Sequence, residues 1–440
     1  MIAPISYGAL SATSANTIKG SKPELIGQTV AKKLGFKVGN TSYSEALGNI
    51  VSNTAQIFDK DLKLNEFEIQ GLTVDDFTVA ANYYDVDGDV EHATMPFTLG
   101  SISHKWLDSN GSEITNETKM IGCGSGLSLP LTLKVSIPVQ VHSIYGDPRD
   151  SEPTVLEQNY QIATTAGICF ARPNQMAVYP NYAWAGKNIG GTWDFNGSSA
   201  IDPILGGGYS SDFVVISNGI TPAGIVNVID GGFRENATRN FPTTGFPKAS
   251  FDLVMAGNAS DYTFSSNGGS AVTVDTSGKV TLNSKPSGAV TITATENATG
   301  QAHPYTFTVA PTKWVVPKLN SANGDGNYTY EEAITACGDE SKIPSRAQLT
   351  NSPLITAPQD WSWMDNFYTR AIGGGVINEW GWSNASTYPG SKWYFSWDYY
   401  WTREKHSSGY PKDYHFIVYS SSGVVHYFDT GRKAYVACLE

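Results

Sequence analysis

Four kinds of side chain in this 440-residue sequence could carry chemistry: cysteines, an acidic run, histidines and a dense group of aromatic rings. None of the cysteines belongs to a Cys-x-x-Cys pair, so zinc binding and thioredoxin-like chemistry have no support. An even number of cysteines favours two structural disulfides in an oxidising compartment, with four buried thiols in a cytosolic protein as the alternative. The cysteines are Cys123, Cys169, Cys337 and Cys438.

The acidic run places Asp85, Asp87 and Asp89 at alternate positions, with Gly88 between the last two. Hard oxygen ligands of this kind bind calcium, but the glutamate that would complete an EF-hand loop is missing. Asp and Gly also supply the dihedral angles of a β-turn. We therefore interpret the run as a turn, with a calcium site as the alternative, and we expect no cofactor.

Enzymatic motifs are missing from the sequence. The seven histidines are scattered, and neither His-Glu-x-x-His nor Gly-x-Ser-x-Gly occurs. The triplet Gly206-Gly207-Gly208 is not followed by the Lys-Ser/Thr pair of a phosphate-binding loop. The sequence therefore favours a protein that is not an enzyme.

The aromatic rings are concentrated between Trp361 and Trp401, which hold seven of the eleven tryptophans. Trp and Tyr are the residues most enriched at interface hot spots, although part of such a group must form the core of a small domain. Gly373–Gly375 and Pro389–Lys392 mark loops, which often carry binding residues. We expect the partner to contact residues in the stretch 378–400, namely Asn378, Trp380, Trp382, Tyr388, Lys392, Trp393, Tyr394, Trp397, Tyr399 and Tyr400.

Charge and composition limit the partners. The net charge is -12 and the isoelectric point is about 5.1, so a nucleic acid would be repelled. The sequence contains no basic run that would bind anionic membranes. It also contains no apolar run that approaches the roughly 18 residues of a membrane span, so we expect no membrane insertion. Met1–Tyr7 lacks the features of a signal peptide, and we interpret the chain as a fragment of a longer protein.

The elements that must position these residues are mostly strands. Short alternating runs separated by Gly, Asn, Asp and Pro are typical of turn-rich β-domains. The last third differs: it predicts a helix over 330–337, a second helix capped by Ser345, a hairpin over 414–429 and a final strand over 434–438. We divide the chain into an N-terminal segment, interpreted as the end of a preceding domain, and three domains, with the ranges 1–65, 66–245, 246–311 and 312–440.

One group of short motifs comprises Tyr262–Ser266, Val272–Asp275, Ser277–Val280 and Val290–Ala294, and Phe241–Phe246 precedes them. Their order resembles a bacterial immunoglobulin-like domain of the intimin/invasin family of bacterial adhesins, and Phe241–Phe246 is similar to the junction before such a domain. Ile343–Leu349, Tyr400–Glu404 and Val436–Cys438 resemble the C-type lectin-like tip domains of intimin and invasin.

The resemblance implies a mostly β fold class, with immunoglobulin-like β-sandwich domains in series followed by an α+β C-type lectin-like domain. It implies that residues 66–245 contain a bacterial adhesion domain and that Cys337 pairs with Cys438. The long loop lacks Glu-Pro-Asn and Gln-Pro-Asp, so calcium-dependent sugar binding is not expected.

The expected function is that of an extracellular bacterial adhesin fragment. A monomer would bind a host cell-surface protein or glycoprotein through its calcium-independent lectin-like domain. The resemblance implies an outer-membrane anchor supplied by an upstream β-barrel that is absent from this sequence. Two alternatives remain: a secreted, non-anchored factor that modulates virulence, and a lectin that binds glycans by Trp stacking.

Overall fold

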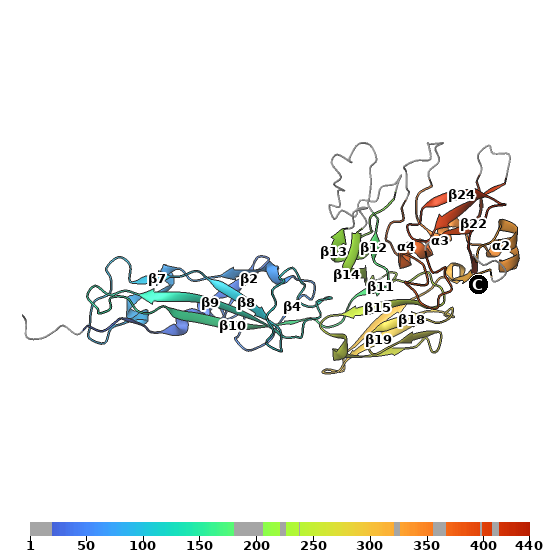
Figure 1. The fold of residues 1–440 in the computed structure, drawn as a ribbon. Coiled ribbons are helices and arrows are strands. Elements are labelled where there is room, and N and C mark those ends of the chain that lie inside the picture. The colour runs from blue at the N-terminus through green and yellow to red at the C-terminus, as the bar shows by residue number, and fades with distance from the viewer. Residues whose placement is uncertain are drawn as a thin grey trace, which may run out of the picture. The chain divides into compact units, whose positions relative to one another are not determined.

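The chain folds into two compact units, which are described separately below. The first comprises residues 1–58, 63–118 and 128–163, and the second comprises residues 59–62, 119–127 and 164–440. The computed structural model (Figure 1) describes residues 20–179, 206–220, 226–236, 238–320, 326–354, 367–396, 398–406 and 413–440. No helix in these ranges is long and apolar enough to span a membrane.

The first unit is built from three antiparallel sheets. The largest has the order β4-β10-β9-β7, with β8 also paired to β9, and the others are β3-β2-β5 and β1-β6. Its strands are β1 (Glu24–Leu25), β2 (Gly35–Val38), β3 (Thr41–Ser44), β4 (Gln56–Phe58), β5 (Phe67–Gln70), β6 (Tyr83–Tyr84), β7 (Phe97–Leu99), β8 (Ser103–Leu107), β9 (Leu131–Val141) and β10 (Thr154–Thr164). Its helical turns are Gln28–Lys33, Glu45–Leu47, Leu64–Glu66, Val74–Asp76 and α1 (Val79–Asn82).

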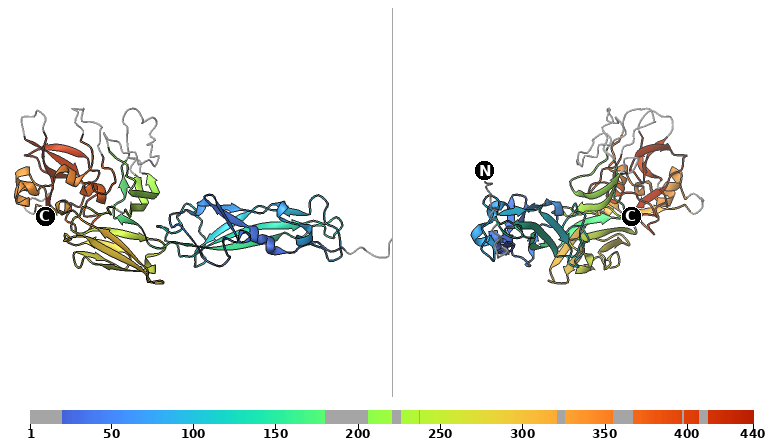
Figure 2. Two further views of the ribbon diagram at one scale, coloured as in Figure 1. Left: turned by 180° about the vertical axis from the view of Figure 1, so that it is seen from behind. Right: turned by 60° about the vertical axis from the view of Figure 1, so that its left-hand side comes forward.

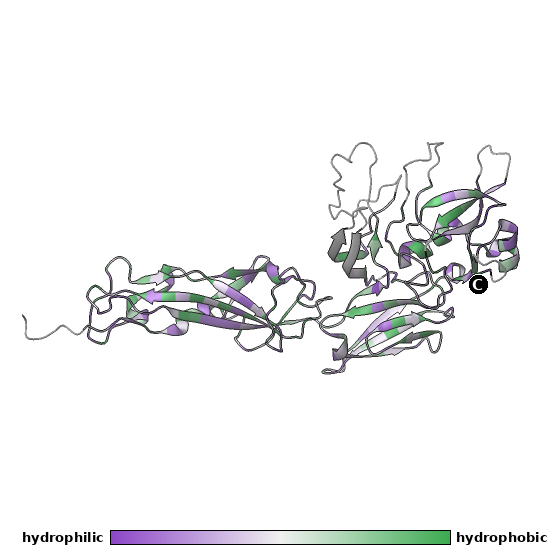
Figure 3. Cartoon of the chain, viewed as in Figure 1, coloured by the Kyte–Doolittle hydropathy of each residue, from purple (hydrophilic) through white to green (hydrophobic). Residues whose placement is uncertain are grey.

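In the long strands, apolar residues alternate with polar ones, and this places one face of each strand in the core. Every second residue of β9 is buried, and hydrophobic and hydrophilic residues follow one another along it (Figure 3). The core includes Phe36 of β2, whose ring centroid lies 5.4 Å from that of Tyr160 in β10. Because this contact joins residues on both sides of position 65, the predicted segment 1–65 packs as part of the same unit as the strands that follow it.

The second unit begins with a seven-stranded sheet in the order β12-β14-β11-β15-β18-β17, with β13 paired to β14. A three-stranded sheet, β16-β19-β20, accompanies it. The strands are β11 (Ile168–Pro173), β12 (Ala177–Val178), β13 (Phe213–Ile220), β14 (Val226–Arg234), β15 (Ala249–Met255), β16 (Tyr262–Ser266), β17 (Val272–Val274), β18 (Lys279–Leu282), β19 (Val290–Glu296) and β20 (Ala302–Phe307).

The predicted domain boundary at residue 245 lies inside the span of this sheet. Strand β11 pairs with β14, which precedes the boundary, and also with β15, which follows it. Figure 1 labels β11, β14 and β15, and Figure 2 shows the ribbon in two further views. The Cys123–Cys169 disulfide attaches residues 119–127 to β11. Strands on both sides of residue 245, from β11 to β15 together with β17 and β18, therefore belong to one sheet.

The remaining elements of the second unit form the C-terminal part that the sequence predicts to be lectin-like. They are α2 (Tyr330–Cys337), α3 (Arg346–Leu349), α4 (Val376–Trp380), β21 (Val315–Lys318), β22 (Tyr399–Lys405), β23 (Tyr414–Tyr419), β24 (Val425–Asp429) and β25 (Val436–Leu439), with helical turns at Pro311–Lys313 and Glu340–Lys342. Two antiparallel sheets, β21-β25 and β22-β23-β24, connect them. A further helical turn, Ala259–Asp261, lies between β15 and β16. The mostly β fold class is confirmed.

Candidate functional site

A disulfide and a strand pair close the C-terminal part of the second unit. Helix α2 begins at a capping box, in which Thr329 accepts a hydrogen bond from the Glu332 backbone, and it ends at Cys337. Cys337 bonds to Cys438 in β25, across 101 residues of sequence. Because β25 also pairs with β21, the first and last strands of this part meet. The pairing that the resemblance implies is present.

Half of the residues expected to contact a partner lie in the core instead. The side chains of Asn378, Trp380, Tyr388, Trp393 and Tyr400 are at most 1% exposed. Trp380 donates from Nε1 to the carbonyl of Thr244, and Tyr388 donates from its hydroxyl to the carbonyl of Trp380. A receptor cannot reach these groups in the folded chain, because they are covered by other elements of the unit.

The buried carboxylate of Glu379 joins α4 to the junction at residues 241–246. It accepts hydrogen bonds from the backbone N–H and the hydroxyl of both Thr243 and Thr244, at distances between 2.6 and 3.2 Å. The backbone N–H of Gly373 donates a further bond of 2.7 Å. Together these charge-assisted hydrogen bonds offset the free-energy cost of burying the carboxylate. Glu379 therefore holds the junction and the C-terminal part together.

Arg370 is the matching buried cation. Its guanidinium donates to the carbonyls of Gln175, Asn378 and Glu379. The ring of Phe213 lies 5.2 Å from the guanidinium carbon. Burial lowers the pKa of Arg370, and neighbouring tyrosines and Glu379 raise it. Both ionisable groups are committed to backbone contacts, which gives them a structural role.

The other expected contact residues are reachable from solvent or lie outside the described part of the chain. Lys392 is exposed, while Trp382, Tyr394 and Tyr399 are half-buried. Trp397 is not among the described residues. The neighbouring Phe395 was not predicted, yet it is 66% exposed, with its ring 4.4 Å from that of Tyr394.

Sequence reasoning also missed four partly exposed rings on the C-terminal sheet, which we call the outer aromatic cluster. Phe416 in β23 pairs with Tyr427 in β24. The ring of His406 stacks on that of Tyr427 at 4.1 Å and lies 5.1 Å from that of Phe416. The ring centroids of Tyr414 and Tyr427 lie 5.6 Å apart. The sequence held one signal for these rings: Tyr414 and Phe416 alternate with His415 along a strand, so the two rings share one face and His415 lies on the other.

His415 belongs to β23, its side chain is buried, and it introduces a pH dependence. It is 1% exposed and stacks on Tyr330 at 3.6 Å. Burial lowers its pKa below the ordinary value of 6.5, and Lys405 lowers it further, while Glu340 and Asp413 raise it. The folded chain therefore keeps His415 neutral at a pH where the unfolded chain has bound a proton.

We expect the second unit to lose stability as the pH falls from about 6.5, because the unfolded state then binds more protons than the folded state. Replacing His415 with phenylalanine keeps a ring against Tyr330 and removes the titration, so the thermal midpoint should fall less between pH 7.5 and pH 5.5. The control is His426→Phe on the adjacent strand. Equal pH dependence of His415→Phe and the unchanged chain would show that His415 does not contribute.

One part of the chain matches a model of a known protein family. Residues 226–307, which run from β14 to β20, match the model of invasin domain 4. This part of the chain is invasin-like. The resemblance seen in the sequence is thereby confirmed, on the part of the chain where the sheet continues through residue 245.

Solved structures give weaker likenesses to the chain. The crystal structure of invasin, a bacterial integrin-binding protein, is 16% identical, with a TM-score of 0.37, and the match covers 78% of this chain and 58% of that one. An intimin mutant from EHEC O157:H7 is 21% identical, with a TM-score of 0.29 over 47% of this chain and 92% of its own. The intimin–Tir90 complex is 20% identical, with a TM-score of 0.30 over 46% of this chain and 89% of its own.

The chain thus spans 58% of the invasin structure that it matches. No curated protein sequence matches the chain. The relationship rests on the domain model, because the TM-scores are low.

Proposed function

We propose that this chain is part of an extracellular bacterial adhesin, and that its lectin-like C-terminal part binds a protein or glycoprotein on a host cell surface. The match to invasin domain 4 supports the adhesin class. The observation that carries the binding proposal is the outer aromatic cluster, where His406, Tyr414, Phe416 and Tyr427 remain partly exposed on one hairpin sheet. Partly exposed aromatic rings on a rigid support are the usual anchors of a protein interface.

The support for these rings is rigid. The sheet β22-β23-β24 packs through Trp401 and Ile417 on a core that includes Tyr330 of α2. The Cys337–Cys438 bridge fixes the same helix to β25. Binding at this surface therefore requires little ordering of the chain, which reduces the entropic cost of association.

The burial of the tryptophans favours a protein partner over a stacked sugar. Trp380, Trp393 and Trp401 are at most 1% exposed, so none of them offers a face to a glycan. Trp382 is half-buried. Apart from Trp382, the described tryptophans of the C-terminal part form core, and most of the partly exposed rings are those of Tyr, Phe and His.

Binding of the fluorescently labelled full chain to cultured animal cells tests the proposal. We expect saturable binding that unlabelled chain competes away and that persists when calcium is chelated. Protease treatment of the cells should abolish it, because the partner is a surface protein. Binding that survives protease but not glycosidase treatment would assign the partner to glycans, and no saturable binding would contradict the proposed function.

A further inference from the structure

The acidic run of the first unit has no part in the binding surface described above, yet its geometry is specific. Asp85, Asp87 and Asp89 follow β6, and each offers one carboxylate oxygen that lies within 4.8 Å of the oxygens of the other two. Among the described residues, no lysine, arginine or histidine forms an ion pair with these three. Three ionised carboxylates at such distances repel one another, and a cation or a proton among them relieves the repulsion.

One oxygen of this group lacks a hydrogen-bond donor. Asp85 is 9% exposed, and its Oδ2 atom is buried without a partner. Its other oxygen, Oδ1, accepts a bond of 3.1 Å from the backbone N–H of Asp87. A buried carboxylate oxygen without a donor is costly, so it points to a ligand that would satisfy it.

The surrounding chain holds the carboxylates in position. The backbone N–H of Ser21 donates to Asp87 Oδ2 at 2.8 Å, and the Tyr83 hydroxyl donates to the Asp89 carbonyl at 2.9 Å. Beyond the run, the N–H of His92 donates to the carbonyl of His142 at 2.9 Å.

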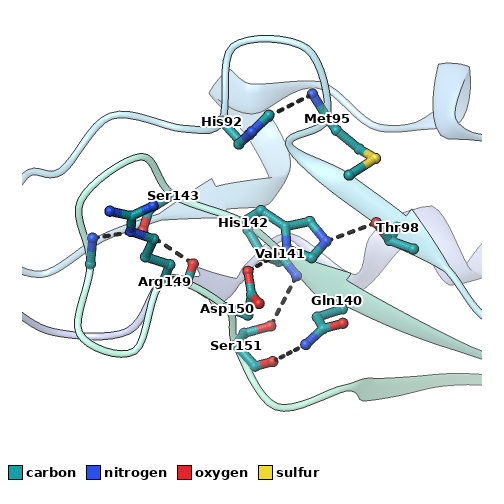
Figure 4. A network of polar contacts seen from close by, with 11 residues as sticks. His92, Met95, Thr98, Gln140, Val141, His142, Ser143, Arg149, Asp150 and Ser151 are labelled. Carbon is teal, nitrogen blue, oxygen red and sulfur yellow. Dashed lines mark hydrogen bonds and ion pairs between the residues drawn. The ribbon is translucent and has the colours of Figure 1, made fainter.

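His142 is itself fixed, because its ring nitrogens contact Asp150 and Thr98 at 2.6 and 2.7 Å (Figure 4). Gly88 has a φ of +83°, which only glycine adopts readily. The acidic loop is therefore anchored on both sides before any ligand arrives.

We propose that Asp85, Asp87 and Asp89 bind one calcium ion. Carboxylates at alternate positions around a glycine supply the hard, flexible oxygen coordination that calcium prefers, and solvent or carbonyl oxygens would complete it. Magnesium fits less well, since it requires compact octahedral geometry and gives up its water reluctantly. Because Ser21 already bonds to Asp87, the ion also ties the segment before β1 to the loop after β6.

The test uses the full chain after treatment with a chelator. Calorimetric titration with calcium chloride should show one site with a dissociation constant of roughly 0.1–1 mM, the range of extracellular calcium modules. Saturating calcium should raise the thermal midpoint of the first unit by about 5 °C, and magnesium should raise it less. The second unit should not respond, which separates this inference from the proposed function.

Asp87→Asn is the informative variant, since Asp87 is exposed and its amide can still accept the Ser21 bond. We expect a loss of calcium affinity of at least about 10-fold, whereas Asp75→Asn, an exposed aspartate of the same unit, should bind calcium as the unchanged chain does. The proposal would be overturned if calcium at 5-fold above the upper end of the expected dissociation range produced neither heat nor a thermal shift. An unchanged calcium affinity of the Asp87→Asn variant would also overturn it.

A second variant keeps the test decisive if Asp87→Asn misfolds. Asp85→Asn removes one of the repelling charges, so without calcium its thermal midpoint should equal or exceed that of the unchanged chain. With saturating calcium the order should reverse, because only the unchanged chain gains from the ion. Parallel responses of the two chains to calcium would contradict binding at these residues.

Discussion

Replacing Glu379 with glutamine is expected to destabilise the second unit by about 3 kcal/mol, because a buried charge and its charge-assisted hydrogen bonds are lost together. The amide nitrogen of the glutamine would also face donors, namely the hydroxyls and N–H groups of Thr243 and Thr244. A urea titration followed by tryptophan fluorescence measures the loss, since Trp380 donates to the carbonyl of Thr244 beside the site.

Glu331→Gln is the matched control. Glu331 is exposed in the first turn of α2, so its replacement should change the free energy of unfolding by less than about 0.5 kcal/mol. If Glu379→Gln cost less than about 1 kcal/mol, the carboxylate would not be the link between the junction and α4 that its contacts indicate.

Removing the Cys337–Cys438 bridge by a double substitution to alanine is expected to lower the free energy of unfolding by about 4.7 kcal/mol, because the bridge closes a loop of 101 residues and restricts the unfolded chain. The same treatment of Cys123–Cys169, which closes 46 residues, should cost about 4 kcal/mol. Chemical unfolding of the two variants beside the unchanged chain gives both values.

The order of the two losses is the critical result. On the chain-entropy model the longer loop must cost more, by about 0.7 kcal/mol. An unchanged unfolding midpoint for the Cys337→Ala/Cys438→Ala variant would contradict the role of the bridge in closing the C-terminal part.

Local patterns predicted the elements that depend on neighbouring residues. Helix α2 occupies the expected range 330–337, because a capping box at Thr329 and a glycine after Cys337 define both ends. The β23-β24 hairpin follows from alternation on either side of Ser421–Gly423. These features are encoded within a few residues of one another, so the sequence alone carries them.

Non-local pairing was out of reach. The sheet that continues through residue 245 depends on β11, which pairs with strands about 60 and 80 residues away. The bonds from Thr243 and Thr244 to Glu379 span 136 and 135 residues. Neither relationship leaves a pattern in the neighbouring residues. A domain boundary was therefore predicted at residue 245, where the sheet continues from one side to the other.

The number of aromatic residues in a stretch also did not predict which rings face the core and which face solvent. Trp380 and Trp393 pack on Phe246, which belongs to the junction, and so they face the core. Phe416 and Tyr427 lie outside the stretch 378–400, on the paired strands β23 and β24, and stay partly exposed. Only the placement of the surrounding elements separates core rings from contact rings.

The central claim is that the outer aromatic cluster contacts the host partner, and cell binding of the Phe416→Ala/Tyr427→Ala variant tests it most directly. We expect at least a roughly 30-fold loss of affinity, corresponding to about 2 kcal/mol, the threshold of a hot spot. Tyr145→Ala, which removes a 68% exposed ring from the first unit, should bind as before. Unchanged affinity of the double variant, or a loss on Phe395→Ala instead, would contradict the claim.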